Sequence, residues 1–134
     1  MIVIDTSVLV AYFNTRDINH QEARFALESV VNGRWGKALL PECVFIETVS
    51  VVKEKLSPLA AIQIGEHLRR VHHFDFIPTS DLFRSAWKEF QSDQTSRLNF
   101  TDHIVAFMAR QRSGGKILTF DSAFRDIPGI VIEQ

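Results

Sequence analysis

The sequence predicts an α/β fold in which helices cover both faces of a parallel sheet. Short apolar runs alternate with longer segments of helical periodicity, which is typical of successive strand–helix–strand units. The apolar runs lack polar alternation, so both faces of each strand are expected to be buried. The chain has 134 residues, the length of one ordinary domain, and we expect residues 1–134 to form a single domain.

The chain opens with a strand that turns directly into a helix. Met1–Ile4 is an apolar, β-branched run, and the apolar stretch Val8–Phe13 follows it at once. A second helix is expected to be capped by Asp17 or Asn19 and stopped by Asn32-Gly33. Its predicted buried stripe consists of Ala23, Ala26, Leu27 and Val30.

The middle of the chain contains the second and third predicted strands. Lys37–Leu40 is the second strand, and a proline then begins a helix over Glu42–Lys55. This helix is apolar around much of its circumference, so it is expected to be buried on more than one side. Ser57-Pro58 supplies the N-cap and first residue of a helix that reaches about Arg70, and Phe74–Ile77 is the third strand.

The last part of the chain is predicted to add two helices and two strands. One helix starts at Thr79 or Ser80 and reaches about Gln91, and the polar, aperiodic segment Ser92–Asn99 is a loop. The remaining elements are the helix Thr101–Arg112, the strand Lys116–Phe120 and the short strand Ile130–Ile132.

Composition indicates a globular protein but not a function. Fifteen Lys and Arg against sixteen Asp and Glu give a formal net charge of −1, which is not the strongly basic balance of many nucleic-acid binders. Cys43 is the only cysteine, which excludes an internal disulfide and cysteine-rich metal sites. No apolar run is long enough for a membrane span and no signal-peptide pattern is present, so we expect a cytoplasmic protein.

Four acidic residues stand out because their surroundings differ from a solvated surface. Asp5 and Asp121 each follow a predicted strand, at the sheet edge where α/β proteins bind ligands. Asp102 lies in the first turn of a helix, and Glu47 lies on a helical stripe of small and apolar residues without a basic neighbour. Each has an ordinary alternative: the aspartates could be helix caps, with Thr101 capping beside Asp102, and Glu47 could pair with an arginine elsewhere.

Together, the four acids indicate a divalent metal site. All of them can reach one edge of a parallel sheet, where clustered carboxylates would repel each other unless a cation lies among them. Oxygen ligands favour Mg²⁺ or Mn²⁺, and such an ion can promote the hydrolysis of a phosphate ester. Thr6, Ser7 and Thr101 supply hydroxyls that could orient the carboxylates or their waters.

These motifs resemble those of the PIN-domain ribonucleases, and specifically of the small VapC-type toxins. The segment Val3–Val10 is similar to the first motif of the family, and Glu47 matches its second acid. Phe100-Thr101-Asp102 before an apolar helix matches the third motif, and Leu118-Thr119-Phe120-Asp121 with Phe124 matches the last. The resemblance covers essentially the whole chain.

The resemblance implies a three-layer α/β/α sandwich with a five-stranded parallel sheet. It implies an endoribonuclease that depends on Mg²⁺ or Mn²⁺ and cleaves single-stranded or looped RNA. Asp5, Glu47 and Asp102 would hold one ion, and Asp121 would assist directly, through water or at a second ion. It further implies a homodimer, acting as the toxin of a type II toxin–antitoxin module and inhibited by a cognate antitoxin whose C-terminal segment fills the groove.

Two features are less specific. Such proteins commonly hold a small residue where this chain has His103, and an exposed or core-edge histidine is the ordinary interpretation. Two basic clusters are candidate RNA contacts, although charged helix ends are usually only solvated. The residues concerned are Arg69, Arg70, Arg110, Arg112 and Lys116.

Other functions fit parts of the pattern. An aspartyl-phosphate-type phosphatase also places an aspartate after its first strand, but it needs a second acid two residues later, where this chain has Ser7. A dinucleotide-binding enzyme needs a glycine-rich turn there, and residues 5–13 contain no glycine. The non-enzymatic alternative is a catalytically silent PIN-like module that binds protein or RNA, although a scaffold gains nothing from clustered carboxylates.

Overall fold

The computed structural model describes residues 1–133, which form a single sheet of five parallel strands. The strands are β1 (Ile2–Ile4), β2 (Ala38–Pro41), β3 (Phe74–Ile77), β4 (Lys116–Leu118) and β5 (Val131–Glu133). Their order is β3-β2-β1-β4-β5, and every neighbouring pair is parallel. The chain proceeds in one direction from β1 to β2 and in the other to β4, so the carboxyl end of β1 is the switch point where open α/β sheets bind ligands.

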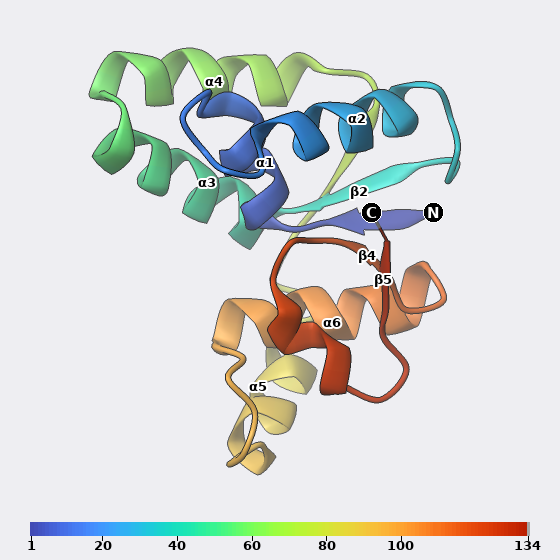
Figure 1. The fold of residues 1–134 in the computed structure, drawn as a ribbon. Coiled ribbons are helices and arrows are strands. Elements are labelled where there is room, and N and C mark those ends of the chain that lie inside the picture. The colour runs from blue at the N-terminus through green and yellow to red at the C-terminus, as the bar shows by residue number, and fades with distance from the viewer. Residues whose placement is uncertain (134) are drawn as a thin grey trace.

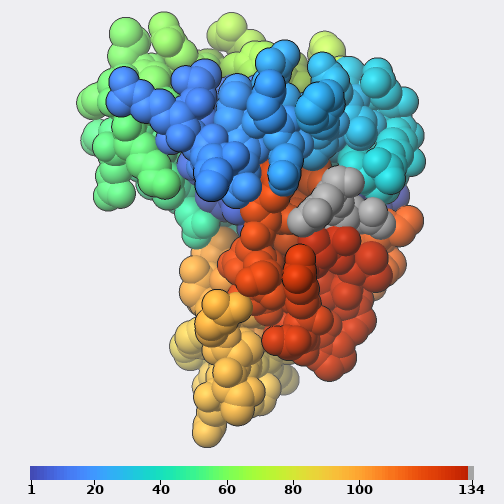
Figure 2. All heavy atoms as spheres, in the orientation of Figure 1, coloured from blue at the N-terminus to red at the C-terminus, as the bar shows by residue number. Residues whose placement is uncertain are grey.

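Helices cover the sheet on both faces. The α-helices of residues 1–133 are α1 (Thr6–Phe13), α2 (His20–Val31), α3 (Glu42–Lys55), α4 (Pro58–Arg70), α5 (Phe83–Ser92) and α6 (Phe100–Arg112). A short 3-10 helix, η1 (Ser122–Asp126), precedes β5. Figure 1 shows α1 to α4 above the sheet and α5 and α6 below it, which confirms the predicted three-layer α/β/α sandwich. The space-filling view in Figure 2 has the same division, with the blue-to-green helices in the upper half.

The core surrounds the central strand. Ile2, Val3 and Ile4 of β1 are fully buried because β2 and β4 flank the strand and helices cover both of its faces. The predicted buried stripe of α2 is confirmed. A strand buried on all sides is a rigid support for the residues that follow it, and the first of these is Asp5. Within residues 1–133, no helix combines the length and apolar character needed to cross a lipid bilayer.

Several element boundaries agree with the sequence. The structure has α3 and β3 at the predicted residues. Ser57 caps α4 as predicted, because its side-chain oxygen accepts a hydrogen bond from the Ala60 amide at 3.0 Å. Asn19, one of the two predicted caps, holds the N-cap position of α2 but makes no side-chain capping bond, and Asp17 Oδ1 accepts from the Asn19 amide at 2.8 Å.

Other boundaries also differ from the sequence predictions. The helix predicted from Thr79 or Ser80 begins at Phe83, because a turn comes first in which the amide of the buried Leu82 donates to the Thr79 carbonyl.

The fourth strand ends at Leu118 instead of Phe120. Beyond Leu118 the chain leaves the strand ladder, and the Phe120 amide donates to the Ser7 hydroxyl at 3.0 Å instead of to a neighbouring strand. The fifth strand begins at Val131, one residue later than predicted.

Candidate active site

A cavity of about 320 Å³ lies at the carboxyl end of β1, and all four predicted acids line it. We call it the carboxylate cavity. Asp5 comes from the β1–α1 junction, Glu47 from α3, Asp102 from α6 and Asp121 from the turn before η1. In Figure 1 this region is on the left, where β1 leads into α1 and α6 begins. Lys55 is the one cationic side chain among the described residues that line the cavity.

Asp5 is held by hydroxyl groups. It occupies the N-cap position of α1 without capping it, so the helix-cap alternative does not explain this carboxylate. Its Oδ2 atom accepts hydrogen bonds from Thr119 Oγ1 at 2.7 Å and from Ser7 Oγ at 3.0 Å. Asp5 is only 5% exposed, and this burial raises the pKa of its carboxyl group although both hydroxyls lower it.

Asp102 forms a capping box with Asn99 at the start of α6. Asn99 Oδ1 accepts from the Asp102 amide at 2.9 Å, and Asp102 Oδ2 accepts from the Asn99 amide at 3.0 Å. Asn99, not Thr101 as the alternative assumed, is therefore the cap. Burial, followed by the negative charges of the other three acids, raises the pKa of Asp102 to about 7.

Asp121 and Glu47 complete the cavity. Asp121 does not end the strand as predicted; it caps η1, with Oδ1 accepting from the Ala123 amide at 2.8 Å. The Asp121 amide donates to Thr119 Oγ1 at 2.9 Å, so one hydroxyl links Asp5 and Asp121. Glu47 is half-buried on α3. None of the four acids forms a salt bridge within residues 1–133, which leaves the expectation of an arginine partner for Glu47 unmet there.

The three predicted hydroxyls have different positions. Ser7 bonds Asp5, as described above, and Thr6 lines the cavity with a buried Oγ1 that has no hydrogen-bond partner within residues 1–133. Thr101 does not line the cavity. Thr119 was not predicted, because it resembled one more strand residue and its partner is 114 positions away. Asn99 and Lys55 were also not predicted. Asn99 could have been, because asparagine directly before a helix is a preferred N-cap residue.

The side chains in the cavity suit a hard divalent cation. They present carboxylates without salt-bridge partners, an unpaired buried hydroxyl and a carboxyl pKa raised by neighbouring negative charge. As they stand, however, no three His, Cys, Asp or Glu side chains of the described chain are grouped so that they could hold one ion. The donor chemistry therefore fits Mg²⁺ or Mn²⁺, and the assignment of these acids as ligands stays a prediction.

The basic residues proposed as RNA contacts do not line the carboxylate cavity. Arg69 and Arg70 are exposed on α4 and pair with Glu66 at 4.0 Å and 3.4 Å. Arg110 forms a salt bridge with Glu89 of α5. Arg112 is the last residue of α6 and Lys116 is the first residue of β4. The cavity lies at the opposite ends of these two elements, at the start of α6 and beyond the end of β4. A role in binding RNA stays a prediction for all five.

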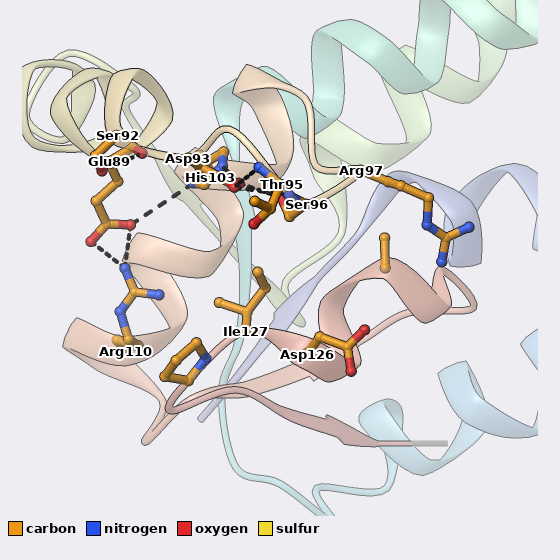
Figure 3. Close-up of a pocket in the computed structure, with 12 residues that line it drawn as sticks. Glu89, Ser92, Asp93, Thr95, Ser96, Arg97, His103, Arg110, Asp126 and Ile127 are labelled. Atoms are coloured by element: carbon orange, nitrogen blue, oxygen red, sulfur yellow. Dashed lines mark hydrogen bonds and ion pairs between the residues drawn. The ribbon is translucent and has the colours of Figure 1, made fainter.

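His103 belongs to a second, larger cavity of about 750 Å³, which we call the histidine cavity (Figure 3). The ring is 5% exposed, and its Nε2 atom lies 2.8 Å from Asp93 Oδ2. Glu89 lies between His103 and Arg110, with Glu89 Oε2 4.0 Å from His103 Nδ1. His103 is therefore a buried, bonded residue and not an exposed one.

Comparisons with known proteins agree with this fold. A family model described as PIN domain matches residues 2–130. A curated VapC ribonuclease from Archaeoglobus fulgidus is 24% identical over 124 residues, which cover 91% of this chain and 78% of the relative. The resemblance predicted from the motifs is confirmed.

Solved structures of the same type superpose well. Mycobacterium tuberculosis VapC20, described as a sarcin-ricin loop cleaving toxin, has a TM-score of 0.86 at 19% identity, covering 97% of each chain. VapBC2 from Rickettsia felis, bound to a DNA fragment from its promoter, has a TM-score of 0.70 at 15% identity, covering 99% of this chain and 98% of that one. A toxin–antitoxin complex from Klebsiella pneumoniae has a TM-score of 0.62 at 19% identity, covering 98% and 96%. At these identities the structures establish a shared fold.

Proposed function

Since the chain belongs to the PIN-domain family, we propose that it is an endoribonuclease that depends on Mg²⁺ or Mn²⁺. The observation that carries this proposal is the gathering of four carboxylates, from four separate elements, around one cavity at the switch point of the sheet. Asp102 and Asp121 also cap helices, but Asp5 and Glu47 do not, and unpaired acids that share a cavity repel one another, so folding alone does not account for the cluster.

We assign Asp5, Glu47 and Asp102 as ligands of one ion, with Asp121 assisting at that ion, through water, or at a second one. A bound divalent ion lowers the pKa of water and neutralises charge on a phosphodiester. No three of these carboxylates are grouped as a ready metal site, so binding an ion would draw in the side chain that is not held, that of Glu47, which forms no side-chain hydrogen bond or salt bridge within residues 1–133.

The other residues of the site orient these ligands. Ser7 and Thr119 hold Asp5 Oδ2, so the Asp5 carboxylate keeps one orientation, with Oδ1 left without a hydroxyl donor. The capping box of Asn99 does the same for Asp102. With a pKa of about 7, Asp102 holds a proton for part of the time at neutral pH and releases it when a cation binds. Lys55, at the cavity wall, provides a positive charge for an RNA phosphate.

The relatives support a biological role for this activity. We propose that the protein is the cytoplasmic toxin of a type II toxin–antitoxin module, that it acts as a homodimer and that a cognate antitoxin inhibits it. The support is the curated relative, named a VapC ribonuclease, and the similar structures described as a toxin and as toxin–antitoxin assemblies.

A cleavage assay tests the proposed activity. The purified protein is incubated with a mixed RNA pool in the presence of Mg²⁺, Mn²⁺ or EDTA, beside Asp102→Asn and a control variant, Asp81→Asn, which removes an exposed acid outside the cavity. We expect cleavage by the wild type and the control with either ion, and none with EDTA or with Asp102→Asn. Metal-independent cleavage would contradict the metal assignment, and no cleavage under any condition would favour the catalytically silent module.

A further inference from the structure

The loop between α5 and α6 is organised around one carboxylate, that of Asp93. Its Oδ1 atom accepts from the Thr95 amide at 3.2 Å and from the Ser96 amide at 3.0 Å, and its Oδ2 atom accepts from the Ser96 hydroxyl. Oδ2 also bonds His103 Nε2 at 2.8 Å. The Asp93 carboxylate therefore ties the start of the loop to the first turn of α6.

The histidine in this network is not explained by core packing. His103 is 5% exposed and packs its ring edge-on against Phe90, with 5.8 Å between centroids. Its buried Nδ1 atom has no hydrogen-bond partner among the described residues, which costs free energy that an apolar side chain would not. Because an ionised carboxylate only accepts, Nε2 is the donor to Asp93. The ring therefore contributes a directed bond to Asp93 that an apolar side chain of similar size could not make.

The same bonds lead to the candidate active site. Ser96 Oγ accepts from the amide of the buried Leu98 at 3.2 Å, which places the next residue, Asn99, at the start of α6. The Asn99 carbonyl in turn accepts from the His103 amide at 3.1 Å. Residues 93–103 thus form a closed loop, and the capping box that holds Asp102 lies within it.

We propose that Asp93 and His103 are positioning residues that fix the Asn99–Asp102 capping box and thereby aim the Asp102 carboxylate into the carboxylate cavity. This inference rests on the proposed function, because it concerns the affinity of that cavity for a divalent ion. The adjacent residues Asp102 and His103 line the two different cavities. In this proposal the residues of the histidine cavity position a residue of the active site, and the cavity is not a second binding site.

Two measurements on the metal-free protein test the proposal. Amide hydrogen exchange by NMR reports the capping box directly, since the amides of Asn99 and Asp102 are its donors. A calorimetric titration with Mn²⁺ reports the affinity of the cavity. The variants are Asp93→Ala, His103→Ala and His103→Gln, in which the glutamine amide can still donate to Asp93. Val30→Ala, a cavity-creating change in α2, is the control for general loss of stability.

We expect Asp93→Ala and His103→Ala to lose protection selectively at the two amides and to bind Mn²⁺ about 10-fold more weakly, as for other groups that orient metal ligands. His103→Gln should recover most of both effects, and Val30→Ala should show neither. If Asp93→Ala does not fold, Asp93→Asn keeps the acceptor oxygen for the loop amides and should give a smaller change in the same direction.

The outcomes separate this proposal from the proposed function. If the wild type binds Mn²⁺ and cleaves RNA while Asp93→Ala changes neither amide exchange nor affinity, the positioning role is overturned and the nuclease remains. Equal effects in Val30→Ala, or no recovery in His103→Gln, would also overturn it. If the wild type binds no Mn²⁺ at all, both the proposed function and this inference fail.

Discussion

The two cavities that meet at α6 differ in whether their acidic side chains have salt-bridge partners. In the larger histidine cavity the two acids on the α5 side are paired, Glu89 with Arg110 and Asp93 with His103, and the third acid of the lining, Asp126, is exposed to solvent. The smaller carboxylate cavity is lined by five acids, the four predicted ones and Asp17, together with Lys55, and none of the five forms a salt bridge within residues 1–133. Volume alone would point to the histidine cavity, whereas uncompensated charge points to the carboxylate cavity as the place where a ligand is needed.

The largest effect should come from removing a carboxylate from the smaller cavity. Asp5→Asn is expected to lower RNA cleavage by at least about 100-fold, because the ligand and the charge that hold the ion are lost. The control is Asp126→Asn, an exposed acid that lines the histidine cavity, which should cleave normally. Cleavage rates and circular dichroism spectra would be compared for both variants; a folded, fully active Asp5→Asn protein would contradict the site assignment.

A divalent ion should stabilise the protein through the carboxylate cavity. At a concentration about 100 times the dissociation constant, Mn²⁺ is expected to stabilise the fold by about 2.7 kcal/mol. The shift in Tm should be larger at pH 8 than at pH 6, because Asp102, with its pKa of about 7, must lose its proton to bind a cation. Differential scanning fluorimetry with and without EDTA measures it, and an equal shift in Asp102→Asn would place the ion elsewhere.

In the histidine cavity, breaking a pair should cost stability instead of activity. Arg110→Met leaves Glu89 without its cation and is expected to lower the free energy of unfolding by about 1–2 kcal/mol, less than for a fully buried pair because both side chains are about one-third exposed. Glu47→Gln in the carboxylate cavity should cause no such loss. Urea denaturation measures the loss of unfolding free energy in both variants. A larger loss in Glu47→Gln than in Arg110→Met would contradict this prediction.

The same contrast predicts a pH effect on stability. The pKa of Asp102 rises from its usual 3.8 to about 7, so between these values the folded protein keeps a proton that the unfolded chain has released. Stability without metal therefore falls as the pH rises through this window. Asp102→Asn, which does not titrate, should be more stable than the wild type by about 1 kcal/mol above pH 7, after allowance for partial exposure, and should have no advantage near pH 4. A constant difference across this range would argue against the shift.

The smallest effect concerns the wall of the carboxylate cavity. Lys55→Ala is expected to reduce the slope of log binding constant against log salt by about 0.7, the value for one phosphate contact to single-stranded RNA. Filter binding of a non-cleaved RNA to Asp5→Asn, with and without the second change, measures the slope. Lys88→Ala, an exposed lysine on α5 outside the cavity, is the matched control, and an equal reduction there would show that Lys55 has no special position.

Periodicity and chemistry were sufficient for the fold and for the gathering of the four acids. Helix α3 has the predicted bounds, but its buried residues, Val44, Thr48 and Val52, form one stripe, so the predicted burial on more than one side is wrong. The strands are apolar because both faces of the sheet are covered, and the acids follow from the rule that parallel strands direct their carboxyl ends to one edge.

What could not be predicted depends on partners distant in the sequence. Thr119 looked like a strand residue, and only the folded chain shows that its hydroxyl holds Asp5. The sequence did not identify the cap of α6, because Thr101 and Asn99 are both good capping residues. In the folded chain the cap is Asn99. The start of α5 was misplaced because Thr79 and Ser80 resemble a cap, while burial of Leu82 requires a turn before the helix.

The hydrogen bond between Thr119 and Asp5 has a consequence for the order of events during protein synthesis. It joins residues 114 positions apart, and β4, one of the two neighbours of β1, also comes from this late part of the chain. A growing chain contains Asp5, Glu47 and Asp102 before Thr119, one of the two hydroxyl donors to Asp5, has been made. Contacts of such long sequence separation form last. The proposed site is therefore complete only after Thr119 has been made and β4 has paired with β1.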